Sequence, residues 1–153
     1  MNCQTFSTGF SSKGLVPPPV LTRAMKPTRF GVIYYGSTSP AMAEAFEALQ
    51  ATGVMVDGLR IRAFPFSAAV DQFIAGHDTV FVVEQNRDAQ LRTLIVTEQE
   101  VNPARLVPVL HYDGTPITAR FIVAAISRHL VPDGLAPPPT ARAVPIPDKA
   151  LES

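Results

Sequence analysis

The sequence predicts an α/β domain in which a mostly parallel sheet lies between two layers of helices. Two patterns lead to this prediction. Short apolar runs rich in β-branched and aromatic residues alternate along the chain with segments whose apolar residues recur at three- and four-residue spacing. Runs that are apolar on both faces are typical of parallel strands, and right-handed helical crossovers then place helices on both faces of the sheet. The expected architecture is therefore a three-layer α/β/α sandwich.

The size and composition of the chain allow one domain and argue against several classes of function. The chain has 153 residues, of which 46% are hydrophobic and 17% charged, so it can bury one core of ordinary size. Its formal net charge is zero, which argues against binding to nucleic acid or to an anionic membrane surface. Cys3 is the single cysteine and cannot form an internal disulfide. With no apolar run of about 18 residues and no signal-peptide pattern, we expect a cytoplasmic protein without a membrane span.

Proline and charge divide the chain into three parts. Of its 15 prolines, only five lie within residues 30–130. Proline fixes φ and lacks a backbone donor, so both flanks are expected to be extended. Residues 1–29 also carry four basic side chains and no acid. We predict an extended Pro-rich arm over residues 1–28, an α/β domain over residues 29–131 and a Pro-rich tail over residues 132–153.

The α/β domain is expected to begin with a buried strand and a helix. Phe30–Tyr35 is almost wholly apolar, which predicts a strand covered on both faces. Ser39, followed by Pro40, is expected to cap the next helix, and Gly53 to end it. The apolar face of this helix is formed by Met42, Ala45, Phe46 and Leu49.

The second strand is predicted either as one broken strand or as a strand with a turn. Apolar residues at 54–56 and 59–63 are separated by Asp57 and Gly58, a pair typical of turns. Arginines alternate with apolar residues in the second piece, so this strand is expected to lie toward an edge with one solvated face.

The strongest strand pattern follows a short helix that begins after Ser67 and ends at Gly76. Residues 79–83 are continuous and β-branched, so we expect them at the centre of the sheet. From Asp88 the period becomes helical, with the acid near the positive end of the helix dipole.

One more strand and one more helix complete the predicted domain. Leu106–Leu110 contains Pro108, which cannot donate to a β-ladder, so this strand is expected at an edge or a bulge. Thr118 is expected to cap the last helix.

Polar residues follow two of the predicted strands and mark one end of the sheet as its working edge. In an open α/β sheet, ligands and partners are met at the carboxyl ends of the strands. The first polar loop could hold a phosphate at a helix N-terminus, or it could only cap the helix. The second could bind a ligand, contact another subunit or cap a helix, and we favour an interface or capping role over catalysis. The interface or crevice candidates are Gly36, Ser37, Thr38, Glu84, Gln85, Asn86 and Arg87.

Other patterns that carry chemistry are missing from the sequence. The histidines lie far apart, without the spacing of a zinc site, and there is no Gly-x-Ser-x-Gly elbow and no dinucleotide or P-loop fingerprint. We therefore assign no catalytic, cofactor-binding or metal-binding residue. Arg87 and Arg92 are expected in ion pairs or partner contacts. Three phenylalanines are expected in the core: Phe64, Phe66 and Phe73.

Four sequence blocks resemble the C-terminal part of the α subunit of 2-oxoacid:ferredoxin oxidoreductases, most closely the 2-oxoglutarate-like type. The blocks are residues 31–40, 59–66, 82–91 and 111–117, and they occur in the same order. The resemblance implies the fold of the transketolase C-terminal domain, in which one strand can run antiparallel. It therefore adds a short strand and gives an expected sheet of four to five strands.

The same resemblance implies a multi-chain enzyme that oxidatively decarboxylates a 2-oxoacid to an acyl-CoA. Thiamine diphosphate, magnesium and iron–sulfur clusters are expected in the full complex and none in this chain, because those parts lie on other domains and on a thiamine-binding β subunit. Ferredoxin would be an indirect partner. A truncated gene, a split subunit or a misplaced start would explain a chain without the upstream α-subunit domains.

The sequence therefore supports two functional hypotheses. The first is an assembly or interface domain of such an enzyme that is incomplete for catalysis on its own. The alternative is a free-standing α/β domain that binds a nucleotide or a CoA-like anion at the carboxyl edge of its strands.

Overall fold

Five strands form one sheet in the order β1-β3-β2-β4-β5, in a computed structural model that describes residues 16–130. β2, β3, β4 and β5 are parallel, and β1 runs antiparallel to β3. The prediction of a mostly parallel sheet of four to five strands is confirmed. The strands are β1 (Val20–Thr22), β2 (Phe30–Tyr35), β3 (Asp57–Ile61), β4 (Thr79–Glu84) and β5 (Leu106–Leu110).

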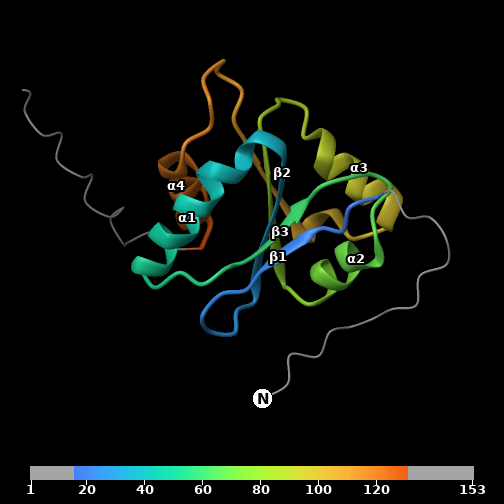
Figure 1. Ribbon diagram of the computed structural model, residues 1–153, viewed down its shortest axis with the longest axis horizontal. Coiled ribbons are helices and arrows are strands. Elements are labelled where there is room, and N and C mark those ends of the chain that lie inside the picture. Colours follow the sequence, from blue (N-terminus) through green and yellow to red (C-terminus); the bar gives the residue numbers. More distant parts are fainter. Residues whose placement is uncertain (1–15, 131–153) are drawn as a thin grey trace, which may run out of the picture.

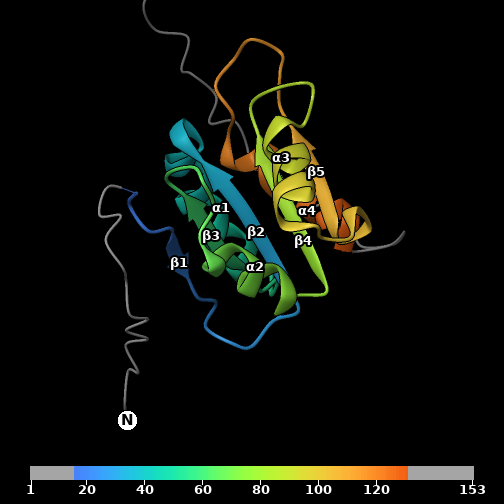
Figure 2. The ribbon, with the colours of Figure 1, turned by 90° about the vertical axis from the view of Figure 1, so that its right-hand side faces the viewer.

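Helices cover both faces of this sheet. Figures 1 and 2 show α1 and α4 on one face and α2 and α3 on the other, which makes the three predicted layers. None of the helices described is long and apolar enough to cross a membrane. The helices are α1 (Ser39–Ala51), α2 (Ala68–Ala75), α3 (Gln90–Gln99) and α4 (Ala119–Leu130), with short 3-10 helices η1 (Gly36–Thr38) and η2 (Pro103–Arg105).

The core consists of two clusters that the inner strands separate. Side chains alternate along a strand, so Val32 and Tyr34 of β2 pack toward α1 and α4, while Ile33 packs toward α2 and α3. On β4, Phe81 and Val82 divide in the same way, and both are fully buried. This burial on both faces explains why these strands are apolar without alternation.

The predicted interruption of the strand at Asp57 and Gly58 is wrong, because both residues belong to β3. A Cβ on Gly58 would lie 2.4 Å from the Cζ atom of Phe46, so the glycine allows an aromatic ring of α1 to pack directly on the strand. Asp57 is 6% exposed and is held by hydrogen bonds from other segments. Inside this strand, the glycine makes room for a packed ring and the aspartate accepts hydrogen bonds from other segments.

Two further expectations differ from the structure in position. The middle strand is β2, and β4 is its neighbour, so residues 79–83 are inside the sheet but not at its centre. α3 begins at Gln90 and not at Asp88, after Ala89 in the left-handed region with φ of 49°. The first turn of α3 starts later because its backbone N–H groups are capped by a side chain of β4, Glu84.

The edge position predicted for the proline-containing strand is confirmed. β5 pairs only with β4 in the sheet described, and Val82 lies opposite Pro108. The backbone N–H of His111 donates to the backbone carbonyl of Glu84 at 2.9 Å, so it points toward β4. N–H groups alternate in direction along a strand, so the nitrogen of residue 108, three positions earlier, points the other way. The proline nitrogen therefore lies on the outer side, where its missing N–H costs no ladder hydrogen bond.

The described residues cover only part of the predicted three-part organisation. β1 lies within the predicted arm, and α4 reaches Leu130 at the end of the predicted α/β domain. Residues 1–15, with Cys3, and the predicted tail from residue 132 lie outside the described residues. The boundaries of the three parts remain predictions.

Candidate functional site

The carboxyl ends of the parallel strands meet at one end of the sheet, where Gln85 joins three loops. Figure 1 shows the loops after β2, β4 and β5 gathered at this upper end. The side-chain amide of Gln85 donates to the hydroxyl groups of Ser37 at 3.0 Å and Thr38 at 3.2 Å. Its oxygen accepts the backbone N–H of Ile117 at 3.3 Å. One side chain therefore braces the loops that follow β2, β4 and β5.

Glu84 is an ionisable group buried at the end of β4, where it caps α3. It has 0% exposure and accepts the backbone N–H groups of Leu91 at 2.8 Å and Arg92 at 2.9 Å. Asn86 donates its amide to the same carboxylate at 2.7 Å. A carboxylate at a helix N-terminus is stabilised by the helix dipole and by otherwise unpaired N–H groups. Of the roles considered for Glu84, the structure therefore provides helix capping.

The loop after β2 is also satisfied from within the domain. Gly36 has φ of 59°, a backbone conformation that favours glycine, and its carbonyl accepts the hydroxyl of Ser39 at 2.9 Å. Thr38 is 2% exposed, while Ser37 is exposed. The expected cap Ser39 is the first residue of α1, and Thr38 occupies the cap position without a side-chain capping bond. The hydroxyl groups of Ser37 and Thr38 accept the hydrogen bonds from Gln85.

Arg87 is separate from the other candidates. Its side chain is 76% exposed, and its Nε lies 3.3 Å from Asp88, the next residue in the same loop. An exposed ion pair of this kind contributes little to stability. Arg87 is therefore free to contact a partner. Gln85 and Glu84 instead hold the neighbouring loops and the first turn of α3 in place.

Aromatic side chains at the same end of the sheet were missed by the sequence analysis. Tyr35 at the end of β2 is 39% exposed, Phe64 after β3 is 54% exposed and Tyr112 after β5 is 61% exposed. The prediction that Phe64 lies in the core is wrong. Phe64 follows β3 beside Pro65, and its ring lies edge-on to the ring of Phe66 with 5.4 Å between the ring centroids. Of these two rings, only Phe66 packs against the core. Their positions in the sequence could have indicated their exposure, because each of the three rings lies at or just after the end of a strand.

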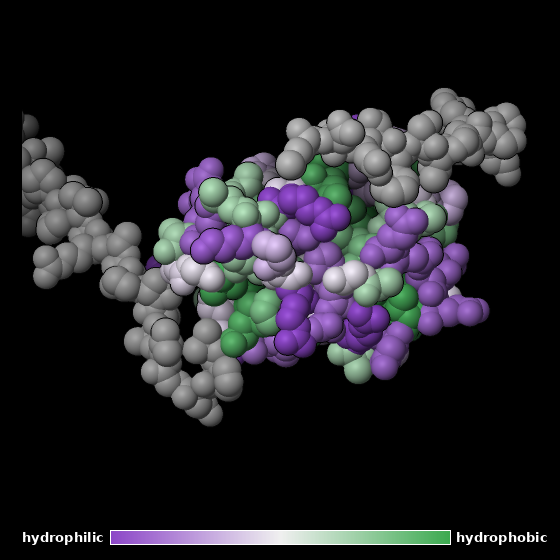
Figure 3. Space-filling view, turned by 90° about the horizontal axis from the view of Figure 1, so that it is seen from below, coloured by the Kyte–Doolittle hydropathy of each residue, from purple (hydrophilic) through white to green (hydrophobic). Residues whose placement is uncertain are grey.

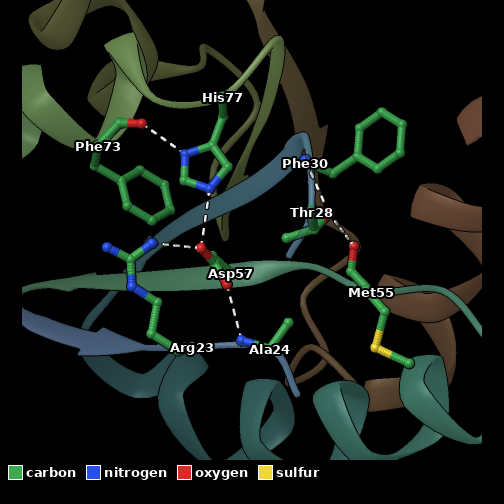
Figure 4. Close-up of polar contacts among 8 residues, drawn as sticks. All are labelled: Arg23, Ala24, Thr28, Phe30, Met55, Asp57, Phe73 and His77. Carbon is green, nitrogen blue, oxygen red and sulfur yellow. Dashed lines mark hydrogen bonds and ion pairs between the residues drawn. The ribbon is translucent and has the colours of Figure 1, made fainter. Parts of the chain in front are cut away.

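A second polar cluster lies at the opposite end of the sheet and was also missed. Figure 4 shows Asp57 at the start of β3 accepting hydrogen bonds from three directions. Arg23 Nη1 donates at 2.6 Å and the Ala24 backbone N–H at 2.8 Å, and His77 Nε2 lies 3.2 Å from the same carboxylate. A groove of about 340 Å³ lies beside this cluster, between the segment that contains β1 and α2. The signal available in the sequence was an aspartate inside an apolar strand.

The electrostatics of this cluster follow from its hydrogen bonds. Burial alone would raise the pKa of Asp57, but the hydrogen bonds from Ala24, Arg23 and His77 outweigh it and hold the pKa below its usual range. His77 Nδ1 lies 2.6 Å from the carbonyl oxygen of Phe73, so both ring nitrogens are engaged within the domain. This histidine has no nitrogen left to act on a substrate in the groove.

The face at this end of the sheet is mostly polar. Figure 3 views the molecule from that side, and hydrophilic residues cover most of the visible surface with smaller hydrophobic areas between them. Within residues 16–130, no group of three or more His, Cys, Asp or Glu side chains is placed to hold a metal ion.

The fold and its braced edge define a class, a transketolase C-terminal-like α/β domain. No protein-family model matches the chain, and a comparison with curated proteins finds no match. Comparison with solved structures finds several. A 2-oxoglutarate:ferredoxin oxidoreductase from Magnetococcus marinus, with 2-oxoglutarate, coenzyme A and succinyl-CoA bound, matches with a TM-score of 0.67 and 26% identity, covering 75% of this chain and 20% of that one.

Two other solved structures share the fold. A split-gene transketolase in an inactive β4 tetramer matches with a TM-score of 0.58 and 20% identity, covering 79% of this chain and 44% of that one. The α chain of a probable 2-oxoacid ferredoxin oxidoreductase from Thermoplasma acidophilum matches with a TM-score of 0.50 and 23% identity, covering 74% of this chain and 97% of that one. The resemblance stated from the sequence, to 2-oxoacid:ferredoxin oxidoreductases with a transketolase C-terminal-like fold, is confirmed. This chain spans about a fifth of the matched Magnetococcus chain.

Proposed function

We propose that this chain is a C-terminal assembly domain of the α subunit of a 2-oxoacid:ferredoxin oxidoreductase, incomplete for catalysis on its own. The likeness to the Magnetococcus enzyme supports the family, with 26% identity over 75% of this chain. The aligned part is a fifth of that enzyme's chain, which is the proportion expected of one domain among several. The four sequence blocks of the resemblance support the α subunit.

The observation that carries the interface role is the set of exposed aromatic rings at the end of the sheet where Gln85 braces three loops. Tyr35 ends β2, Phe64 follows β3 and Tyr112 follows β5, and Gln85 joins the loops after β2, β4 and β5. Aromatic side chains are enriched in the centres of protein interfaces, and a rigid scaffold lowers the entropy cost of association. We call these three rings, with Ser37 and Arg87, the docking edge.

The lateral edges of the sheet are poorly suited to association. β1 has only three residues, and β5 places Pro108 with its nitrogen on the outer side. A short strand and a proline both limit pairing with a strand of another chain. This favours docking through the loops at the carboxyl ends of the strands.

In this proposal the cofactors belong to other parts of the complex. Thiamine diphosphate, magnesium and iron–sulfur clusters would be held by other α-subunit domains and by a thiamine-binding β subunit. This domain would position those parts and help to close the cleft between them, with ferredoxin as an indirect partner. A 2-oxoglutarate-like substrate is suggested by the resemblance and by the Magnetococcus neighbour, which has 2-oxoglutarate bound.

The alternative of a free-standing nucleotide or CoA binder finds no support. Its natural anion site would be the N-terminus of α3, but Glu84 already places a buried carboxylate there. A second negative charge at that point would be repelled. The other helix N-terminus considered for an anion lies at η1 and the start of α1. There the hydroxyl groups of Ser37 and Thr38 accept hydrogen bonds from the side-chain amide of Gln85.

Size-exclusion chromatography tests the proposal directly. The full chain is mixed with the thiamine-binding β subunit and the upstream α-subunit domains encoded in the same genome. Co-elution of the three, with 2-oxoacid oxidation that requires this chain, is the expected outcome. A chain that always elutes alone and leaves the activity of the other subunits unchanged would contradict the proposal.

A further inference from the structure

We propose that His77 and Asp57 form a proton-linked latch that holds residues 19–29, which we call the arm segment, on the amino ends of the parallel strands. The arm segment contains β1 and the loop that leads into β2. The latch does not depend on the proposed function, because all of its parts belong to one chain. It lies at the end of the sheet opposite to the docking edge.

Asp57 is the residue on which the arm segment is fixed. One carboxylate oxygen accepts the Ala24 backbone N–H at 2.8 Å, and the other accepts Arg23 Nη1 at 2.6 Å. Asp57 itself is 6% exposed, while the Arg23 side chain is 65% exposed. A second contact follows along the segment, where the Thr28 hydroxyl donates to the carbonyl of Met55 at 2.5 Å. Figure 4 shows both contacts near the start of β3.

The ring of His77 contacts Asp57 and faces two acceptors. Its Nδ1 lies 2.6 Å from the Phe73 carbonyl oxygen, which can only accept a hydrogen bond. Its Nε2 lies 3.2 Å from Asp57 Oδ2, and an ionised carboxylate also only accepts. Both contacts are hydrogen bonds only when the ring carries two protons. The geometry therefore matches a charged imidazolium beside a carboxylate, with His77 only 4% exposed.

Loss of one proton breaks one of these two contacts. A neutral ring protonated at Nδ1 turns the lone pair of Nε2 toward the carboxylate of Asp57. A neutral ring protonated at Nε2 turns the lone pair of Nδ1 toward the carbonyl of Phe73. In either form the cluster loses a hydrogen bond inside a buried site, where an unmade bond is costly.

The nearest other charge among the described residues is Arg23, whose Nη1 lies 2.6 Å from Asp57 Oδ2, the same oxygen that His77 faces. β2 contributes Gly31, where an added Cβ would lie 3.2 Å from the His77 ring, and α2 contributes the ring of Phe73 at 4.4 Å. From η2, Arg105 donates to the backbone carbonyl of His77 and not to its ring. Arg29 and Asp78 form a separate ion pair at the surface.

The direction of the pH dependence follows from these contacts. The arm segment is held most firmly where His77 is charged and Asp57 is ionised. Raising the pH removes one ring proton, so either Asp57 loses one of its three donors or the ring loses its hydrogen bond to Phe73, and the arm segment is held less firmly. The groove of about 340 Å³, lined by Pro19, Leu21, Asp57 and His77 among others, widens when the segment moves.

Nuclear magnetic resonance of the full chain tests the latch between about pH 5 and about pH 9, the range in which histidine charge changes in proteins. Long-range nitrogen–proton spectra report the protonation of each ring, with His111 and His129 as internal references. Hydrogen exchange of the Ala24 amide, corrected for its intrinsic pH dependence, reports release of the arm segment. We expect His77 to carry two ring protons at the acidic end, and Ala24 protection to fall about tenfold as that charge is lost, as for one charge-assisted hydrogen bond.

Variants separate the latch from general unfolding. His77→Gln should remove the pH step in Ala24 protection, and the matched control His129→Gln should leave it unchanged. If His77→Gln does not fold, the wild-type titration alone decides, because the ring and the amide must change at the same pH. The proposal is overturned if His77 stays in one neutral form throughout, or if Ala24 protection does not follow the charge of His77.

Discussion

The carboxylate of Glu84 accepts the backbone N–H of Arg92 at 2.9 Å although Glu84 is fully buried. The same residue receives the N–H of Leu91, so one side chain at the end of β4 starts α3. Arg92 also contacts the next strand, because its Nε donates to the backbone carbonyl of Leu106 at 2.8 Å, at the start of β5. One residue of α3, Arg92, thereby contacts both the end of β4 and the start of β5.

Glu84→Gln should destabilise the domain. The amide removes the negative charge from the helix N-terminus and turns an NH₂ group toward donors, so we expect a loss of about 2 kcal/mol in the free energy of unfolding. Urea denaturation measures it. Asp88→Asn, an exposed acid in the same loop, is the control and should change stability by less than about 0.5 kcal/mol. Equal losses in both variants would show that Glu84 is not the cap.

Gly58→Ala should destabilise the packing of α1 on β3. The new Cβ would lie 2.4 Å from the Cζ atom of Phe46, and overpacking of this kind costs about 1–3 kcal/mol. Thermal and urea unfolding measure the loss. Phe46→Leu frees the space, so in that background the same change should cost clearly less. An unchanged cost in the double variant would mean that the strain lies elsewhere.

Pro108→Val should increase self-association. The change restores a backbone N–H on the outer side of β5 and a β-branched side chain on an edge strand. Analytical ultracentrifugation at several concentrations should show dimers or larger species that the wild type lacks. Pro116→Val, in the loop after β5, is the matched control. A monomeric Pro108→Val would indicate that this proline does not protect the edge.

Asp57 should make the stability of the domain sensitive to acid. Its folded-state pKa lies below the ordinary value of 3.8, so its stabilisation is fully present above that value and is lost as the pH falls through the lower folded pKa. Denaturation between about pH 2 and about pH 6 should show a step that Asp57→Asn removes. Asp113→Asn, at an exposed aspartate whose pKa is also lowered by hydrogen bonds from Thr115, tests whether the step belongs to Asp57. A step that survives Asp57→Asn would assign it to other carboxylates.

The layers of the fold could be predicted because the strands and helices bury apolar residues in regular patterns. β2 and β4 are apolar on both faces, and the helices repeat apolar residues every three or four positions. Pro108 gave the position of β5 correctly, since a residue without an N–H has few places in a sheet. These are local consequences of backbone chemistry.

The errors arose where contacts between distant residues decide the structure. Asp57 resembles a turn residue until Arg23, Ala24 and His77 are placed around it. Phe64 resembles a core residue, but the turn after β3 directs only Phe66 inward. The polar candidates at the carboxyl ends were correctly placed at one edge, yet only the structure shows that Gln85 and Glu84 are used for bracing and capping. A sequence pattern does not contain these pairings.

The affinity of the chain for the thiamine-binding subunit with its upstream α-subunit domains tests the central claim most directly. Isothermal titration calorimetry should show that Tyr112→Ser and Phe64→Ser each weaken binding about tenfold, the loss typical of truncating an interface anchor. Met25→Ser is the control, since Met25 is 77% exposed in the arm segment at the other end of the sheet, and it should bind like the wild type. Weaker binding by Met25→Ser, with the aromatic variants unchanged, would contradict the docking edge.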